Sequence, residues 1–463
     1  MLRIVAVSRV SIENRYVLGG ALCAVWVTSI LGVALADSLF VRDRNVSVLE
    51  RPRPEYQAPG IRAGQFIVRP KVDIGAGYNS NVFALSNVDA ALGYDSFEEE
   101  SDVFGYIRPS VRVESDWSRH ALAFGGYVEA TRFNRYDSES IVNGGVYVDG
   151  QYDISSRAAV FGGGSLDELS ESRRSYNTAF LFDEPITYTL AEVYAGFQNE
   201  AGRFRYLGRV DVDQYDFKDV RLAMPEGTGG VTVPADQDFR DRTATEFKGE
   251  IGFALTPDTA LFLTGIYNIQ DFQPSDEVTA PERDSDGYRI TFGAEFDLTK
   301  LIRGRLDIGY FEQTYDDPSY SSIDGIAVDA QAQWFPTELT TVSLTGSRGV
   351  AQSAIISAGG LIETEATLRV DHELLRNLIL SGFVAYGHDD YQDRIVGSTG
   401  DGVRQTADSW GGGLSAKYYL NRHVSAGIDY TYETQDVKRD VFSGGFDTDY
   451  DIHQILFTIT LER

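Results

Sequence analysis

The sequence predicts an all-β fold, a single transmembrane antiparallel β-barrel of about 18 strands. Three observations lead to this prediction. Segments in which apolar and polar residues alternate recur along the chain, and a period of two marks a strand with unlike faces. Short polar turns alternate with longer polar segments between them. The 463 residues include 26 Tyr, 26 Phe and 46 Gly but only 13 Pro, which suits uninterrupted strands and their turns.

Hydropathy and length exclude other classes. Mean hydropathy is -0.21, and beyond the first 36 residues no apolar run approaches the about 18 residues of a membrane-spanning helix. A chain of 463 residues would ordinarily form two or three soluble domains, and a single large barrel is the main exception.

Charge and cysteine content exclude further functions. The net charge of -28 argues against nucleic acid as a partner, because nucleic acid requires a basic surface. Cys23 is the only cysteine and lies in the N-terminal leader. The mature chain therefore has no thiol for catalysis or for a thiolate metal site, as suits an oxidising compartment.

Residues 1–36 are predicted to be a secretory signal peptide. Three arginines precede an apolar core, and Ala34 and Ala36 form the A-x-A cleavage site. Because the apolar core is long, an uncleaved inner-membrane anchor is the alternative.

Residues 37–63 are predicted to be a periplasmic lead-in, and residues 64–463 the barrel. The lead-in is polar and contains three prolines without a sustained period. Two alternatives are left for this segment: it packs in the mouth of the barrel, or it is disordered.

The first long strand is predicted from Phe66 to Tyr78. Phe66, Val68 and the following even-numbered residues lie on one side, and polar residues and glycines share the other with Ile67. Its thirteen residues suit a tilted strand, because a strand needs roughly 9–11 residues to cross the hydrocarbon.

The region around this strand carries a family resemblance. The residues concerned are Arg51–Tyr56 (RPRPEY), Gly60–Arg62 (GIR) with Gly64, and Gly77–Phe83 (GYNSNVF). They resemble the N-terminal signature of the outer-membrane proteins called beta-barrel porin 2, found beside polysaccharide-export operons in Gram-negative bacteria. The resemblance implies an outer-membrane barrel that passes exopolysaccharide or other polar solutes.

Turn spacing predicts the number of strands. Eight short turns, from Asp116–Arg119 to Asn421–Arg422, mostly recur at roughly 40-residue spacing, one strand–loop–strand unit. Nine longer polar segments lie between them, including 134–140, 214–240 and 271–286. This pattern requires 18 strands, with short periplasmic turns and long extracellular loops.

Strand phases support a barrel. Between Gly287 and Leu298, Tyr288, Ile290 and Phe292 share one face and Arg289 lies on the other. Four strands are apolar on both faces and their phase stays ambiguous: 121–133, 158–166, 260–269 and 378–386. A soluble double sheet could use such strands, but it explains poorly the polar row of the others.

Aromatic residues near the short turns predict an interfacial girdle: Trp117, Trp334, Phe335, Tyr418 and Tyr419. Ordinary strand-end aromatics are the alternative. The last strand, 450–463, ends in Leu-Glu-Arg instead of the aromatic residue common in such barrels, so Phe457 is expected to replace that signal.

Charged residues on the inward rows are predicted to line a pore: Arg112, Arg205, Arg209, Glu250, Arg289, Arg303, Arg305, Asp307 and Arg369. About 18 strands leave a water-filled lumen. One hypothesis is that opposed arginine and carboxylate rows create a transverse field that selects polar or anionic solutes. The alternative is a solvated wall with salt bridges between strands.

Catalysis and metal binding find little support. The five histidines are scattered, and no common catalytic or nucleotide-binding motif occurs. His388-Asp389-Asp390 superficially resembles residues of outer-membrane proteases. The acidic segments 95–102 and 236–241 could offer oxygen ligands to calcium, although neither has EF-hand spacing and solvated charge explains them more simply.

The sequence therefore predicts a passive channel in the outer membrane of a Gram-negative bacterium, without enzymatic activity, cofactor or metal. Outer-membrane lipid, lipopolysaccharide and the barrel assembly machinery are expected partners, and the resemblance adds polysaccharide and export proteins. The alternatives are a structural or surface-interaction barrel with a plugged lumen and, less favoured, an outer-membrane hydrolase.

Overall fold

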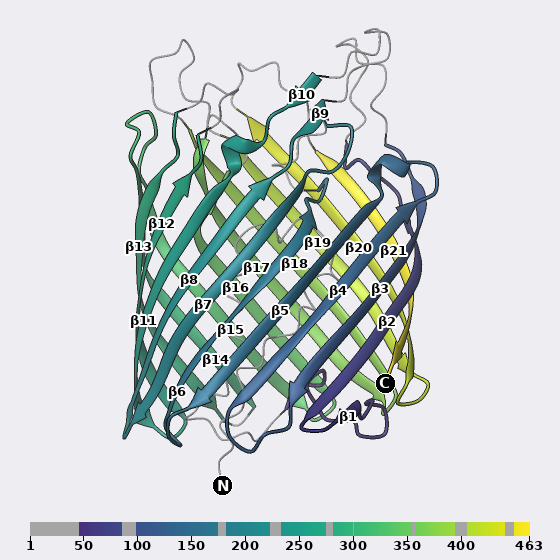
Figure 1. Ribbon diagram of the computed structural model, residues 1–463, viewed down its shortest axis with the longest axis vertical. Coiled ribbons are helices and arrows are strands. Elements are labelled where there is room, and N and C mark those ends of the chain that lie inside the picture. Colours follow the sequence, from purple (N-terminus) through teal and green to yellow (C-terminus); the bar gives the residue numbers. More distant parts are fainter. Residues whose placement is uncertain are drawn as a thin grey trace.

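The computed structural model describes residues 46–85, 99–174, 182–222, 233–274, 281–299, 301–353, 358–393, 405–439 and 449–463. One antiparallel sheet of 19 strands contains the barrel (Figure 1). Eighteen of its strands are long, and the other is the three-residue β1 (Ile61–Ala63), which pairs with β2.

The long strands follow one another around the wall in chain order, and the first pairs with the last. They are β2 (Phe66–Asn79), β3 (Asp102–Ser115), β4 (Ala121–Phe133), β5 (Ile141–Asp153), β6 (Ala158–Ser170), β7 (Thr187–Ala201), β8 (Phe204–Phe217), β11 (Arg242–Thr256), β12 (Thr259–Phe272), β13 (Ser285–Leu298), β14 (Ile302–Tyr315), β15 (Ile323–Thr337), β16 (Thr340–Gln352), β17 (Ala358–Leu375), β18 (Leu378–Asp393), β19 (Gln405–Tyr419), β20 (Val424–Arg439) and β21 (Tyr450–Glu462). Pairing of Lys71 to Asn79 with Glu462 to Gln454 closes the sheet.

The predicted fold class and strand count are confirmed. Short turns join the strands at one end and longer connections at the other (Figure 1). The remaining elements are the hairpin of β9 (Val220–Leu222) with β10 (Val233–Ala235) and the 3-10 turns η5 (Asp137–Glu139) and η6 (Asp238–Arg240). No helix in the described ranges is long and apolar enough to cross a membrane.

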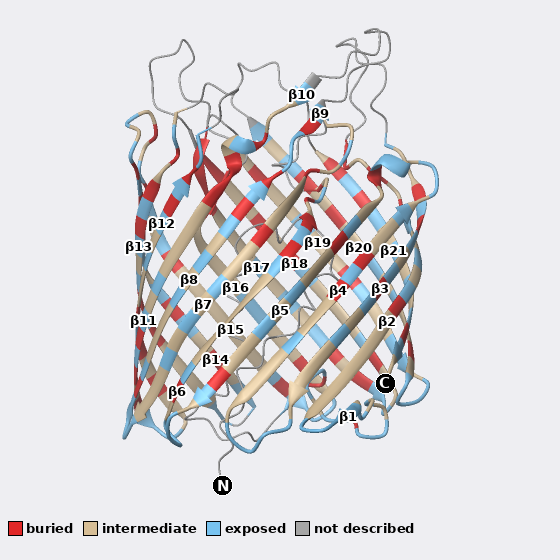
Figure 2. Cartoon of the chain, in the orientation of Figure 1, coloured by how far each residue is buried: buried red, intermediate tan, exposed pale blue. Residues whose placement is uncertain are grey.

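The alternating pattern separates the two faces of the wall, as Figure 2 shows by the change of burial along each strand. On β13, Tyr288, Ile290 and Phe292 are 40%, 53% and 59% exposed on the outer surface. Arg289 turns inward and bonds Asp329 on β15. These positions confirm the predicted phase of this strand. The opposite phase would place Arg289 on the outer face, where an arginine in contact with lipid costs about 2–4 kcal/mol.

The structure also settles the strands whose phase was ambiguous. On β4, Phe124 and Val128 lie on the outer face, whereas Tyr127 and Glu129 are buried on the inner face. Tyr127 donates its hydroxyl to Asp167 of β6, a polar contact that only the inner face provides. Packing across strands therefore decides the phase where both faces look apolar in sequence.

Only part of the predicted girdle faces outward. Trp117, Trp334 and Tyr418 are exposed on the outer surface near the short turns. Phe335 is buried beneath the Arg303 guanidinium, 5.3 Å away, and the Tyr419 ring contacts Tyr56. Since consecutive strand residues face opposite sides, one of each adjacent pair had to turn inward.

Several strands continue beyond their expected ends at the long-loop side. The strand predicted to end near Val212 runs to Phe217, and β12 and β14 reach Phe272 and Tyr315. Segments predicted as loops therefore contribute inner-wall side chains.

Two sequence predictions fall beyond the described part of the chain. The cleavage residues Ala34 and Ala36, and Cys23, lie outside the described residues.

Candidate functional site

The inner wall is the candidate functional site, and all nine charged residues predicted to line a pore lie on this face. They occupy alternate positions between the exposed apolar residues of six strands: Arg112 on β3, Arg205 and Arg209 on β8, Glu250 on β11, Arg289 on β13, Arg303, Arg305 and Asp307 on β14, and Arg369 on β17.

Most of the arginines pair with a carboxylate two residues further along the same strand. Arg209 Nε lies 2.8 Å from Asp211, and Arg369 Nε lies 2.9 Å from Asp371. Arg112 contacts Glu114 in the same way. Residues i and i+2 share one face of a strand, so the backbone period brings each pair together. The charges are therefore compensated locally along the wall.

Arg305 is the centre of the most connected group. Its Nε donates to Asp307 at 2.6 Å, and its Nη2 donates to Glu250 of β11 at 2.9 Å. The guanidinium lies 4.3 Å from the ring centroid of Phe262. Both carboxylates are nearly fully buried. This network joins β11, β12 and β14, and removing its cation would leave two buried carboxylates without a charge partner.

The structure brings Arg289 and Arg303 to different partners. Arg289 contacts Asp329, whereas Arg303 donates to Gln333 at 2.8 Å and lies 3.6 Å from Glu50. Arg303 therefore meets a chain segment that precedes the barrel.

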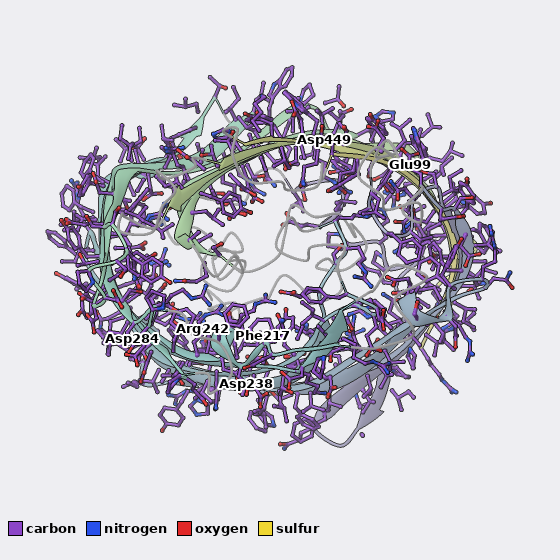
Figure 3. The ribbon with its side chains drawn as sticks, turned by 90° about the horizontal axis from the view of Figure 1, so that it is seen from above. Glu99, Phe217, Asp238, Arg242, Asp284 and Asp449 are labelled. Carbon is purple, nitrogen blue, oxygen red and sulfur yellow. The ribbon has the colours of Figure 1, made fainter. Side chains whose placement is uncertain are left out.

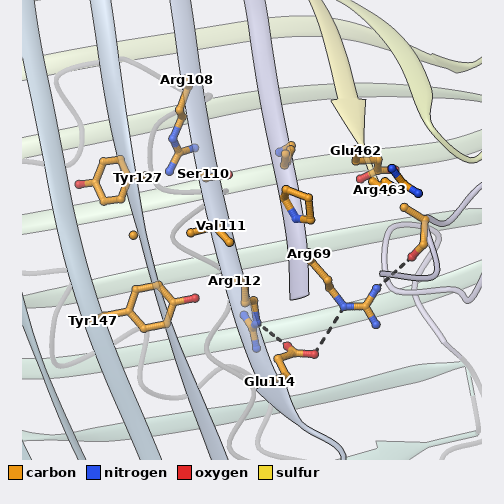
Figure 4. Close-up of a pocket in the computed structure, with 14 residues that line it drawn as sticks. Arg69, Arg108, Ser110, Val111, Arg112, Glu114, Tyr127, Tyr147, Glu462 and Arg463 are labelled. Carbon is orange, nitrogen blue, oxygen red and sulfur yellow. Dashed lines mark hydrogen bonds and ion pairs between the residues drawn. The ribbon is translucent and has the colours of Figure 1, made fainter. Parts of the chain in front are cut away.

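A cavity of about 290 Å³ opens at the short-turn end between β2, β3, β4 and β5 (Figure 4). Arg69 and Arg112 both contact Glu114, at 3.6 Å for Arg69, and Tyr127 and Tyr147 lie on the opposite side in Figure 4. Its lining residues are Ala58, Arg69, Pro70, Lys71, Arg108, Ser110, Val111, Arg112, Glu114, Gly126, Tyr127, Tyr147, Glu462 and Arg463. The cavity thus combines fixed cations with two aromatic rings, a chemistry suited to polar solutes.

Residues 46–60, the N-terminal segment, follow the inside of the short-turn end from β14 to β2. Val48 donates its backbone N–H to Thr341 of β16, and Arg53 lies 3.0 Å from Glu373 of β17. Arg69 of β2 donates to the Ala58 carbonyl at 2.9 Å. Ion pairs and backbone contacts therefore hold this segment against the stretch of wall that runs from β14 to β2.

Gly60 ends the N-terminal segment and requires glycine for two reasons. Its φ of +77° is a conformation that L side chains rarely adopt, and a Cβ there would approach Ile67 Cγ2 to 2.5 Å. It leads directly into β1, and the chain then reverses at Gly64 and Gln65 to pair β1 with β2.

The described acidic loop residues have structural partners. Asp102 accepts the backbone N–H groups of Arg135 and Tyr136 at 2.7 and 3.2 Å. Residues 95–98 lie outside the described residues.

Asp219, Asp236 and Asp238 form a second acidic group, with one carboxylate oxygen of each within 4.8 Å of the others. Two of these carboxylates already accept backbone N–H groups: Asp219 from Gln237 at 3.0 Å, and Asp236 from Asp238 at 2.7 Å. Such partly exposed groups keep the oxygens solvated or hydrogen-bonded without requiring a metal.

His388 lies on the outer face, where its Nδ1 is 2.8 Å from Asp408 and both residues are near Tyr386 and Lys438. Asp389, the next residue, necessarily points to the inner face. The His-Asp-Asp sequence is therefore divided between the two sides of the wall and does not form one site.

Sequence reasoning missed two groups of inner-wall residues. Arg53 and Glu373 are separated by 320 positions, and no local pattern signals their pairing. Tyr215, Arg242 and Phe272 were assigned to loops or loop borders, although alternation beyond Val212 places Tyr215 and Phe217 in step with Arg209 and could have revealed the longer strand.

Residues 53–463 match the family model described as Putative beta-barrel porin 2. No protein with a curated function matched the sequence.

Solved structures that match the chain include a ferric enterobactin receptor and the proteins OpdL and OccAB4. The ferric enterobactin receptor of Pseudomonas aeruginosa, as its R480A mutant with enterobactin, is 8% identical with a TM-score of 0.46, covering 88% of this chain and 82% of the receptor. Pseudomonas aeruginosa OpdL is 10% identical with a TM-score of 0.41, and the match covers 87% of this chain and 99% of OpdL. Acinetobacter baumannii OccAB4 is 10% identical with a TM-score of 0.43, and the match covers 88% of this chain and 100% of OccAB4.

Proposed function

The chain belongs to the Putative beta-barrel porin 2 family, and from that premise we propose that it is a passive outer-membrane channel for polar solutes. One observation carries the proposal: the closed barrel of 18 long strands is apolar outside and charged inside. A barrel of this strand number encloses an aqueous channel when its lumen is open. The family is one of porins and not of enzymes.

We assign pore-lining roles to the nine charged residues of the inner wall. Because Arg209 and Arg369 pair along their own strands, each contributes a local dipole to the wall. Selection of solutes would then depend on arginines of the inner wall near the short-turn end, such as Arg303, which lies 3.6 Å from Glu50.

A link to exopolysaccharide export is the finer part of the proposal. It is supported by the resemblance of residues 51–83 and by the cavity beside Tyr127 and Tyr147, because aromatic rings can stack against sugar rings while arginines bind their hydroxyl or acidic groups. The partners required are outer-membrane lipid, lipopolysaccharide and the barrel assembly machinery, together with polysaccharide and proteins of an export complex.

A second candidate is a structural or surface-interaction barrel with a closed lumen. The N-terminal segment favours it, because Val48 and Arg53 hold residues 46–60 against the inner wall at the short-turn end. A closed barrel would still bury the same charged wall.

Single-channel conductance of the refolded protein in a planar bilayer tests the proposal. A passive pore gives steady conductance steps that polar oligosaccharides of increasing size reduce up to a size limit. A correctly folded barrel that gives no steps under any voltage would refute the channel and favour the structural alternative.

A further inference from the structure

A row of alternating aromatic and arginine side chains crosses the inner wall at the long-loop end. Tyr215 of β8 lies directly opposite Arg242 of β11, and Arg242 lies directly opposite Phe272 of β12. Directly opposed residues share one face of a sheet, so strand register alone aligns these three side chains. All three are buried, and Figure 3 places Arg242 and Phe217 along the same stretch of the wall.

Arg283, two residues before the start of β13, extends the row. The Arg242 guanidinium carbon lies 3.9 Å from the Tyr215 ring centroid and 5.8 Å from that of Phe272. Arg283 lies 4.6 Å from the Phe272 centroid and 5.5 Å from that of Phe239. The two guanidinium groups therefore share the Phe272 ring, and the stacking restricts their orientation before any ligand arrives.

These two cations lack a carboxylate partner within the described part of the chain. Arg242 donates only to the Arg240 carbonyl, at 3.3 Å, and its Nε has no hydrogen-bond partner among the described residues. Arg283 donates to the carbonyls of Ser353 and Phe239. Exposed fractions of 5% for Arg242 and 4% for Arg283 make such uncompensated charge costly.

The nearby carboxylates are occupied by other groups. Glu171 binds Arg240, with 3.0 Å between Oε2 and Nη1. Asp241 accepts the backbone N–H of Phe217 at 2.6 Å, and Asp284 accepts that of Phe272 at 2.7 Å. Asp241 and Asp284 keep their charge, but in the described part of the chain no carboxylate forms an ion pair with Arg242 or Arg283, whose hydrogen bonds go to carbonyl oxygens.

We propose that Arg242 and Arg283 form a binding site for an oxyanion group, a carboxylate or a phosphate, carried by a solute in the lumen. The inference deepens the proposed function and rests on it for the solute's route. A guanidinium presents a planar fork that matches either oxyanion, and a desolvated setting strengthens that contact. Because little of either side chain is exposed, the site recognises the anionic group and leaves the rest of the solute in the channel. Binding must stay weak enough for release.

Calorimetric titration of the full-length refolded protein in detergent at low salt tests the site. Inorganic phosphate and glucuronate are the probes, and glucose is the uncharged control. Binding of either anion, without binding of glucose, is expected. The double variant Arg242→Gln with Arg283→Gln should weaken it at least about tenfold, or 1.4 kcal/mol.

Two further variants separate the site from general charge and from folding. Arg132→Gln removes an exposed arginine that pairs with Asp137 at 3.2 Å near the long-loop end, and the anion affinity of this variant should match that of the unmodified protein. Arg242→Lys keeps the charge but loses the fork and the stacking, so an intermediate affinity is expected. Each variant must retain the strand signal in circular dichroism, and binding is compared only among folded proteins.

The outcomes distinguish the site from the channel. Binding of phosphate alone or glucuronate alone supports the site and identifies its ligand. Absence of binding for both anions, or equal weakening of anion binding by Arg132→Gln and by the double variant, overturns it. Conductance without anion binding would refute the oxyanion site and support the channel. Anion binding without conductance would refute the channel and support the oxyanion site.

Discussion

Arg53 in the N-terminal segment donates from Nη2 to Glu373 on the inner face of β17, 3.0 Å away, and both side chains are almost fully buried. Arg51 reaches the same Glu373 oxygen at 3.3 Å. One carboxylate of the wall thus compensates two arginines of the segment that precedes the barrel.

Glu373→Ala is expected to release the N-terminal segment, because it leaves Arg53 buried without a charge partner. Removing one member of a buried pair costs about 3–5 kcal/mol. We expect a lower thermal unfolding midpoint and a larger single-channel conductance. Glu55→Ala is the matched control, since Glu55 pairs with Arg376 in an exposed contact of 3.8 Å. Equal effects of the two variants would contradict the anchoring role.

Arg303→Glu is expected to make the channel more cation-selective. The residue lies on the inner face near the short-turn end, where it donates to Gln333. Reversing its charge therefore changes the electric field in the barrel opening at that end. The reversal potential in a salt gradient measures the change. Lys438→Glu alters a charge on the outer face and should leave the reversal potential unchanged. If Lys438→Glu shifts the reversal potential as much as Arg303→Glu does, the effect of Arg303 is not specific to the lumen.

Arg305→Met is expected to destabilise the barrel by about 3–5 kcal/mol, because Glu250 and Asp307 would remain buried without their cation. Denaturant unfolding in detergent measures the loss. Lys218→Met removes a lysine from a half-exposed pair with Glu168, where about 0–1 kcal/mol is expected. If both substitutions cost the same, the Arg305 network has no special energetic role.

Leu414→Arg is expected to impair membrane insertion, because Leu414 is 69% exposed on the outer face in the middle of β19. An arginine facing lipid near the midplane costs about 2–4 kcal/mol. Folding into lipid vesicles, followed by the altered gel migration of folded barrels, measures this. Ser415→Arg places the same side chain on the inner face, so it should fold at nearly the normal yield. Normal folding of Leu414→Arg would contradict the assigned phase.

Asp241 is expected to give a pH-dependent contribution to stability. Burial raises the pKa of its carboxyl to about 6, with Asp216, Asp238 and Asp236 adding to the increase and the hydrogen bond from Phe217 opposing it. A carboxyl with a raised folded-state pKa favours folding in its protonated form. Its contribution is therefore present below the ordinary aspartate pKa and is lost as the pH rises through about 6.

Asp241→Asn keeps an acceptor for the Phe217 N–H and removes the buried charge. At pH 7 this variant should unfold at a higher temperature than the unmodified protein, and at pH 4 the two should converge. A constant difference between the two pH values would contradict the raised pKa.

The sequence by itself determined the barrel. A period of two separates lipid-facing from lumen-facing residues, so Ile290 and Arg289 could be placed on opposite faces without coordinates. Turn spacing determined the strand number for the same local reason. Sequence did not decide β4, where Phe124 and Tyr127 are both apolar enough for either face, nor which of Trp334 and Phe335 would turn inward.

Only the tertiary structure decided how the inner-wall charges are partnered. Pairs such as Arg209 with Asp211 follow from the strand period, but Arg53 meets Glu373 across 320 positions and Arg305 meets Glu250 across 55. The row of Tyr215, Arg242 and Phe272 depends on the register of three strands. Register and closure bring together residues that the chain separates, and burial then determines which charges are compensated and which remain available to a ligand.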